Sequence, residues 1–261
     1  MTAPAPGSQL AATRVAPNST GSTATRVLGT ASLAGLAALA VFGLAISPSD
    51  AKLGETIRIL YMHVPTVSVA YLAFVLTAVA SAIYLWKRTE FWDLLAASSA
   101  EIGVVFFGLT IFNGMMWGKT TWGTYWEWEP RLVTTTVLFI TYIGYLVVRT
   151  IPTEPRTRGT ISAVIGLMAV VNIPITHKAV DWWRGLHQSG TVLGKVDPDM
   201  KGSQLFTTYL GLTTFLVLFA WLLIHRFRVA FLAERAAERG LQGAIAERRA
   251  EGGPAGGGTR P

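Results

Sequence analysis

Cysteine is absent from this chain of 261 residues. Without thiols the protein can form no disulfide bond and can offer no thiolate to a metal, so thiol chemistry is excluded. Any metal ligation must come from its four histidines, or from methionine or carboxylate side chains. Glycine-rich phosphate loops and the HExxH and GxSxG motifs are also missing, so if the protein serves an energy-driven transporter, another subunit supplies the ATP.

Charge is scarce as well. Only 14% of the residues are charged and 51% are hydrophobic, with a mean hydropathy of +0.43, whereas soluble domains carry about 25% charged residues. This composition is typical of an integral membrane protein, whose partner is the lipid bilayer. The net charge of +7 would be compatible with nucleic-acid binding. The basic residues lie in short loops between apolar runs, however, so we expect no nucleic-acid partner.

Six apolar runs, each near the roughly 20 residues of a helical span, predict an all-α polytopic membrane protein with six transmembrane helices. They occupy residues 27–46, 60–86, 94–116, 131–150, 160–177 and 204–225. The first run could be a cleaved signal peptide, but its length favours an uncleaved span. The implied organisation is a disordered tail over 1–25, a membrane domain over 26–226, and a cytoplasmic basic helix with a flexible tail over 227–261.

Six spans bring both termini to one side of the membrane. Lys and Arg are in excess on that side, mainly through the arginines that follow the last span. The positive-inside rule then predicts that both termini are cytoplasmic in a bacterial inner membrane. Segments 47–59, 117–130 and 178–203 would face outward, and most of the tryptophans and histidines lie in or beside them. This concentration favours a ligand site on the outer face.

One of these outer segments is crowded with aromatic side chains. Residues 117–131 read Trp-Gly-Lys-Thr-Thr-Trp-Gly-Thr-Tyr-Trp-Glu-Trp-Glu-Pro-Arg. An aromatic belt at the membrane interface is the simpler interpretation. The glycines between the rings would let a planar ligand approach the backbone, which favours a stacking surface for a porphyrin. The candidate contacts are Trp117, Trp122, Gly123, Tyr125, Trp126 and Trp128.

Histidines on the same face are candidates for ligating haem iron, since neutral imidazole is a common haem ligand. His63 lies at the outer end of the second run and His187 in the longest outer loop, so the two could grip one iron from separate segments. The alternatives are a hydrogen-bonded interfacial histidine and a solvated loop histidine. Pro65 fits the first turn of a helix. His177 follows a helix-breaking Asn-Ile-Pro and is more simply a polar partner for freed backbone groups.

Haem b, the cofactor this pattern favours, carries two propionates that need cations. Arginine pairs carboxylates in a bidentate manner, although solvation at the membrane edge is the alternative for each basic residue. The candidates near the ring and its propionates are Trp182, Trp183, Arg131 and Arg184, with Arg58 and Lys119 on the same face. Glu101 lies inside the third run, far from this face, so we expect it to bond a neighbouring helix or a partner subunit.

Several segments together resemble the CcmC family of haem-handling proteins in cytochrome c maturation. Residues 122–129, Trp-Gly-Thr-Tyr-Trp-Glu-Trp-Glu, resemble the tryptophan-rich WWD signature, WGxxWxWD. Tyr61-Met-His-Val-Pro65 is similar to the first histidine motif of that family, and residues 171–188 to its second histidine loop. Trp117-Gly-Lys leads into the signature as it does in CcmC. The chain departs from the pattern at Glu129, where the signature has Asp, and at Tyr125, where Trp is frequent.

The resemblance implies a haem-binding protein that is not an enzyme. Such proteins present haem at the outer face of the cytoplasmic membrane for transfer to a CcmE-like chaperone. They act beside a CcmD-like small membrane protein and a CcmA–CcmB-like ABC transporter. Matched residue by residue, the resemblance implies that His63 and His187 are the axial ligands of the iron. Those that hold the ring would be Trp122, Trp126, Trp128 and Glu129.

Three other functions are alternatives to this hypothesis of haem delivery. A CcsA- or CcmF-like cytochrome c haem lyase would tend to be longer, with more spans and additional histidines. A respiratory subunit with buried b-type haem would carry facing histidine pairs within its spans. An ABC permease without haem affinity would show no Soret absorbance after haem is added.

The stacking interpretation makes a first prediction. Replacing Trp126 with alanine should weaken haem retention by roughly 1–3 kcal/mol, by analogy with the stacking of nucleic-acid bases on aromatic side chains. Haem titration followed at the Soret band measures the change. Unaltered retention in Trp126→Ala would contradict a stacking role for this ring.

Overall fold

The computed structural model describes residues 21–183, 185–187 and 200–251, and these residues are almost entirely helical. Six of its helical segments are long and apolar enough to cross a membrane, which confirms the predicted all-α, six-span fold. The elements are α1 (Thr23–Val41) continued by the π-helical turn η1 (Phe42–Ile46), α2 (Ile57–Lys87), α3 (Glu90–Trp122), α4 (Pro130–Thr150), α5 (Pro155–Val170), α6 (Asn172–Trp182) and α7 (Gly202–Glu251).

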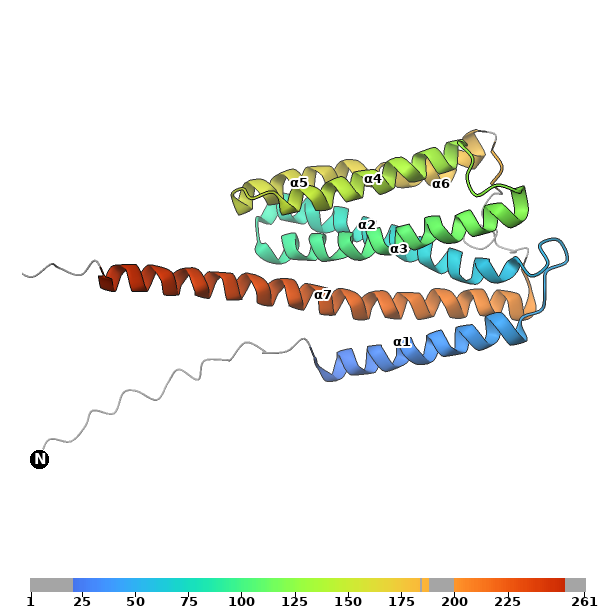
Figure 1. Ribbon diagram of the computed structural model, residues 1–261, viewed down its shortest axis with the longest axis horizontal. Coiled ribbons are helices and arrows are strands. Elements are labelled where there is room, and N and C mark those ends of the chain that lie inside the picture. Colours follow the sequence, from blue (N-terminus) through green and yellow to red (C-terminus); the bar gives the residue numbers. More distant parts are fainter. Residues whose placement is uncertain (1–20, 184, 188–199, 252–261) are drawn as a thin grey trace, which may run out of the picture.

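The helices form successive layers (Figure 1). α2 and α3 pair at the centre, and α7 packs against both of them. α1 packs on the outer side of α7, while α4 and the α5–α6 pair cover the opposite side of the α2–α3 pair. α5 contacts both α2 and α4, whereas α6 packs mainly against α4. The fifth span is therefore two helices, and it breaks at Val171, beside the predicted Asn-Ile-Pro interruption.

The core is locked by aromatic rings from α2 and α4. The ring of Phe74 stacks on that of Tyr142, with centroids 3.7 Å apart and planes 9° from parallel. The Tyr142 hydroxyl also donates to the Phe74 carbonyl oxygen at 3.2 Å. Gly103 of α3 faces the same Phe74 ring, and a Cβ at this glycine would lie only 2.6 Å from it. The lack of a side chain at Gly103 thus permits the close approach of α3 to α2.

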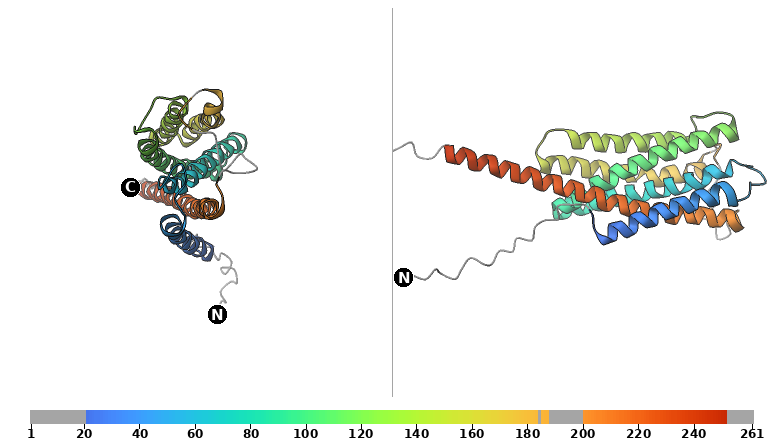
Figure 2. Two further views of the ribbon diagram at one scale, coloured as in Figure 1. Left: turned by 90° about the vertical axis from the view of Figure 1, so that its right-hand side faces the viewer. Right: turned by 60° about the horizontal axis from the view of Figure 1, so that its bottom comes forward.

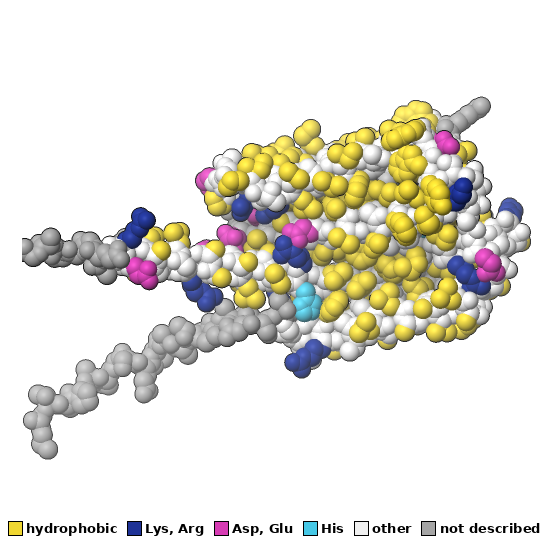
Figure 3. All heavy atoms as spheres, in the orientation of Figure 1, with side chains coloured by type: hydrophobic (Ala, Val, Ile, Leu, Met, Phe, Trp, Pro, Cys, Tyr) yellow, Lys and Arg dark blue, Asp and Glu magenta, His cyan; other side chains and the backbone are white. Residues whose placement is uncertain are grey.

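The surface of the bundle is apolar along the spans. Figure 3 shows hydrophobic side chains over the visible face of the bundle, with most charged side chains toward its ends and along the projecting part of α7. Leu33, Val105 and Ile140 are each more than 60% exposed. Exposed aliphatic side chains at these positions are unfavourable in water and favourable in lipid, as expected of a multi-pass membrane protein.

α3 is longer than its apolar run at the end of the bundle away from the chain termini. α3 continues to Trp122, so the first part of the segment predicted as an outer loop over 117–130 is helical. The helix ends only at Gly123, whose φ of 80° is left-handed. Lys119 supports this end because its Nζ donates to the Gly123 carbonyl oxygen at 3.0 Å. A glycine tolerates this conformation without steric cost, which makes it the natural helix terminator.

The prediction that Pro65 lies in the first turn of a helix was wrong. α2 begins at Ile57, so Pro65 is inside the helix. An internal proline removes one backbone hydrogen bond and frees a carbonyl. Here the backbone of α7 closes on the gap, because a Cβ at Gly211 would lie 2.9 Å from Pro65 Cγ and 3.0 Å from the Tyr61 carbonyl oxygen. Packing against a neighbouring helix thus tolerates the proline within the span.

The described ends of the chain lie at one end of the bundle (Figures 1 and 2). α7 is a single helix of 50 residues, so the predicted last span and the predicted basic helix after it are continuous. Its later part projects past the end of the bundle at which α1 begins. The predicted N-terminal tail falls mostly outside the described residues, as does the predicted flexible tail after Glu251. α3 and α6 end, and α7 begins, at the other end of the bundle.

Ion pairs join the helices in the half of the bundle nearer the termini. Arg149 of α4 donates to both oxygens of Asp93 of α3, at 2.7 and 2.8 Å, and both side chains are mostly buried. Arg226 of α7 pairs with both oxygens of Glu101, so Glu101 has an interhelical partner. Pairing with an opposite charge lowers the energetic cost of placing these charged side chains in apolar surroundings.

The Arg149–Asp93 pair gives a stability prediction. Asp93→Asn leaves a buried guanidinium without its counter-charge and should destabilise the fold by about 3–5 kcal/mol. Thermal unfolding of the detergent-solubilised protein measures this loss. The double variant Asp93→Leu/Arg149→Leu removes both charges and should recover most of the stability, because paired burial offers little net gain over apolar packing. If Asp93→Asn is as stable as the wild type, the Arg149–Asp93 pair does not stabilise the fold.

Candidate functional site

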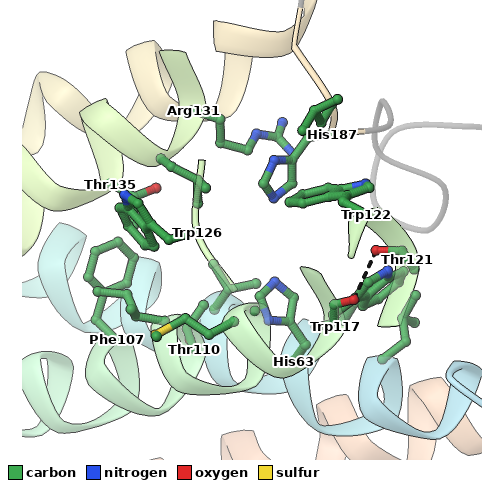
Figure 4. A pocket seen from close by; sticks show the side chains of 18 of the residues that line it. His63, Phe107, Thr110, Trp117, Thr121, Trp122, Trp126, Arg131, Thr135 and His187 are labelled. Carbon is green, nitrogen blue, oxygen red and sulfur yellow. Dashed lines mark hydrogen bonds between the residues drawn. The ribbon is translucent and has the colours of Figure 1, made fainter. Parts of the chain in front are cut away.

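A cavity of about 370 Å³ lies at the end of the bundle away from the termini, among α2, α3 and α4 (Figure 4). Its volume is within the range of small-molecule and cofactor sites, about 300–1,000 Å³. The lining is mostly apolar and aromatic with a few polar groups. Of the residues predicted for the site, it includes His63, Trp117, Trp122, Tyr125, Trp126, Arg131 and His187.

His63 enters the cavity from α2 and is fitted against α3. A Cβ at Gly114 of α3 would lie 3.2 Å from its Cε1 atom, so the glycine provides the room that the imidazole occupies. The ring of Trp117 meets it edge to face, with centroids 6.2 Å apart. The Nδ1 atom is buried and makes no hydrogen bond within the described part of the chain. Buried polar atoms are seldom left unpaired, so this nitrogen marks a site that favours a ligand.

His187 reaches the cavity from the opposite side and is held by Glu129. The Glu129 side chain is buried and directly precedes α4. One of its oxygens accepts the backbone N–H of Leu186 at 2.6 Å and that of His187 at 3.4 Å. The other oxygen pairs with the imidazole Nδ1 of His187. The ring of Trp122 meets this imidazole edge to face, with centroids 4.7 Å apart. In Figure 4 the His63 and His187 rings face the same space.

The electrostatics favour a neutral imidazole at His187. Burial holds the pKa of His187 below its ordinary value, and the Glu129 carboxylate acts in the opposite direction. A neutral imidazole keeps the nitrogen lone pair that a metal needs. With Nδ1 engaged by the carboxylate, Nε2 is the nitrogen left for a ligand.

The predicted aromatic residues divide into two groups. Trp117, Trp122, Tyr125 and Trp126 line the cavity. Trp128, Trp182 and Trp183 are outside the lining and are 74%, 58% and 49% exposed, although Trp128 meets the Trp126 ring edge to face. Gly123 is also outside the lining, where it ends α3. Arg184 lies outside the described residues.

The predicted cations divide in the same way. Arg131 lines the cavity, and one of its guanidinium nitrogens donates to the His177 carbonyl oxygen at 2.9 Å. Arg58 instead pairs with Glu55 at 2.5 Å and donates to the Gly43 carbonyl oxygen. Lys119 lies over the Tyr125 ring, 5.3 Å from its centroid. Within the described residues, Arg131 is therefore the cation best placed to meet an anionic group in the cavity.

The inner end of the cavity was missed by sequence reasoning. It is lined by Tyr71 of α2, Phe107 and Thr110 of α3, and Thr135 of α4. His177 of α6, expected from the sequence to be a polar partner for backbone groups, also lines the cavity. A helical signal was available, because Val67 and Tyr71 follow His63 at spacings of four residues and therefore share its face. On α3, Thr110, Gly114 and Trp117 follow one another at spacings of four and three residues, so they also share one helix face.

Comparison with known proteins decides the family. The model of the CcmC family, described as heme exporter protein C, matches residues 8–242. The chain belongs to the CcmC family. As a CcmC-family member it is 32% identical over 225 residues to heme exporter protein C of Bradyrhizobium diazoefficiens, which covers 86% of this chain and 85% of that protein. It is 35% identical over 189 residues to heme exporter protein C of Escherichia coli K12, which covers 72% and 76% respectively. The resemblance expected from the sequence is thereby confirmed.

The fit of His63 against Gly114 gives a prediction for this CcmC-family cavity. Gly114→Ala should displace the imidazole and weaken the binding of added haem by about 1–3 kcal/mol, a typical cost of overpacking. Titration followed at the Soret band measures the change. Gly108→Ala on the same helix is the matched control, since its Cβ would meet Phe139 at an ordinary 3.7 Å. Equal affinities for the two variants would show that the position of His63 does not matter.

Proposed function

We propose that this chain binds haem b in the cavity and presents it at the outer face of the bacterial cytoplasmic membrane for transfer to a CcmE-like chaperone. The observation that carries the proposal is the pair of imidazoles, His63 and His187, which come from separate segments and face one cavity. Haem is here cargo that the protein holds and passes on, so the proposed activity is delivery rather than catalysis.

The residues of the cavity suit this cargo. Two neutral imidazoles are a common axial pair for haem iron. The unpaired Nδ1 of His63, whose ring is seated against Gly114, supports a ligand beside this ring. Trp122 and Trp126 flank the space between the two imidazoles (Figure 4). Aromatic rings there would contact a porphyrin through faces and edges, and Arg131 would pair with a propionate.

The relatives support the same cargo. Proteins similar over most of the chain are named heme exporter protein C. The family relation also supports partners of the kinds expected from the sequence, namely a CcmE-like chaperone, a CcmD-like small membrane protein and a CcmA–CcmB-like ABC transporter. The transporter would supply nucleotide chemistry for which this sequence has no motif.

The orientation we propose has both termini in the cytoplasm. The excess of Lys and Arg on the side of the termini supports it, and the described ends of the chain lie together at the end of the bundle opposite the cavity. In this arrangement residues 26–226 are the haem-handling membrane unit. The part of α7 after residue 226 lies on the cytoplasmic side.

The ligand assignment predicts a low-spin, six-coordinate haem spectrum for the purified protein. His63→Ala and His187→Ala should each lose haem or hold it weakly, because each removes one axial ligand. Optical spectra and haem content after purification measure the effect. His225→Ala is the matched control, since His225 is on α7 beside Trp221, outside the cavity lining. Wild-type haem spectra in both ligand variants would rule out the assignment.

A further inference from the structure

The two candidate ligands are held in different ways. His63 is within α2, and its backbone carbonyl accepts the hydroxyl of the buried Thr66 at 2.9 Å. Its ring is confined by Gly114 and Trp117 of α3. The His63 backbone thus belongs to the α2–α3 pair at the centre of the bundle, and its ring packs directly against α3.

His187 lies outside any helix, and the adjoining Leu186 is 52% exposed. The described hydrogen bonds of Leu186 and His187 all end on one carboxylate, that of Glu129. Gly185 lies close to the same group, because a Cβ at this position would be 2.4 Å from a Glu129 oxygen. Within the described residues, the hydrogen bonds that tie Leu186 and His187 to the bundle thus depend on a single acidic side chain.

The Glu129 side chain is directed to the His187 segment rather than to its own helix. It is the N-cap residue of α4, a position from which a side-chain oxygen can accept a backbone N–H of the first helical turn, as Glu154 does at α5. The Glu129 side chain makes no such capping bond. Its oxygens turn instead to the segment that carries His187.

We propose that Glu129 is a positioning residue that holds His187 on the iron until handover, and that His187 is then the ligand released while His63 stays bound. This inference rests on the proposed haem-binding function. With Nδ1–H directed at the carboxylate, the lone pair of Nε2 faces the iron and the imidazole is a stronger donor. When the carboxylate releases Nδ1 and the backbone N–H groups, His187 loses the hydrogen bonds that hold its imidazole at the cavity. The bond between iron and His187 Nε2 breaks with its electron pair kept by the imidazole, and that face of the iron is opened to a ligand from the acceptor.

The test is Glu129→Gln, which keeps the size of the side chain and removes its charge. We expect part of the haem to become five-coordinate and high-spin, and its reduction potential to become more positive, because the remaining His187 ligand is a weaker donor. Transfer of haem to apomyoglobin, used as a neutral acceptor, should be about 10- to 100-fold faster, the usual range for removing an outer partner of a metal ligand. Added imidazole should restore the six-coordinate spectrum.

Three further variants sharpen the comparison. Glu127→Gln is the matched control, with the same change at an exposed acid two residues away, and should behave as the wild type. Glu129→Asp keeps the charge and should retain more six-coordinate haem than Glu129→Gln. Gly185→Ala displaces the carboxylate without altering it and should reproduce the faster transfer even if Glu129→Gln folds poorly.

These variants distinguish failure of the Glu129 proposal from failure of the proposed haem-binding function. Wild-type spectrum, potential and transfer rate in Glu129→Gln and Gly185→Ala would overturn the inference while leaving haem binding by His63 and His187 intact. Retained haem and faster transfer in His63→Ala, with loss of haem in His187→Ala, would reverse the order of release and also overturn it. Haem spectra unchanged in both histidine variants would instead remove the proposed function itself.

Discussion

The register between α2 and α3 is the constraint on which the rest of the structure depends. Two glycines of α3, Gly103 and Gly114, are eleven residues apart, and they receive the rings of Phe74 and His63, which are eleven residues apart on α2. Eleven residues are close to three helical turns, so both contacts fall on one face of each helix. The same antiparallel register therefore packs the aromatic core and places the imidazole at the cavity. A shift of one residue would disturb both contacts at once.

α4 completes the site at the edge of this pair. Its first residues bring Arg131 to the cavity, and the carboxylate of its N-cap residue, Glu129, pairs with the imidazole of His187. In the proposed function, one ligand belongs to the α2–α3 pair and the other is hydrogen-bonded to the Glu129 side chain. Under that proposal, retention and release of the cargo are assigned to different imidazoles.

Much of the architecture could be predicted from local sequence features. The six apolar runs all fall within helices, and the break before Asn172 is where the Asn-Ile-Pro sequence indicated. Predictions that depended on contacts between segments were less complete. Arg58 and Lys119 are on the expected face but bind other groups, and Trp182 and Trp183 lie outside the cavity lining. The position of Pro65 was misjudged, because proline is usual in the first turn of a helix whereas α2 begins at Ile57, eight residues before it.

By itself the sequence determined that this is a six-span helical membrane protein with most of its histidines and tryptophans gathered toward one end, because span length, apolarity and residue type are local properties of the chain. Only the tertiary structure decided which of those side chains share a cavity and that Glu129 holds His187. That choice follows from helix rotation and register, which are set by the packing of residues far apart in the chain, such as Gly114 against His63, and not by either segment alone.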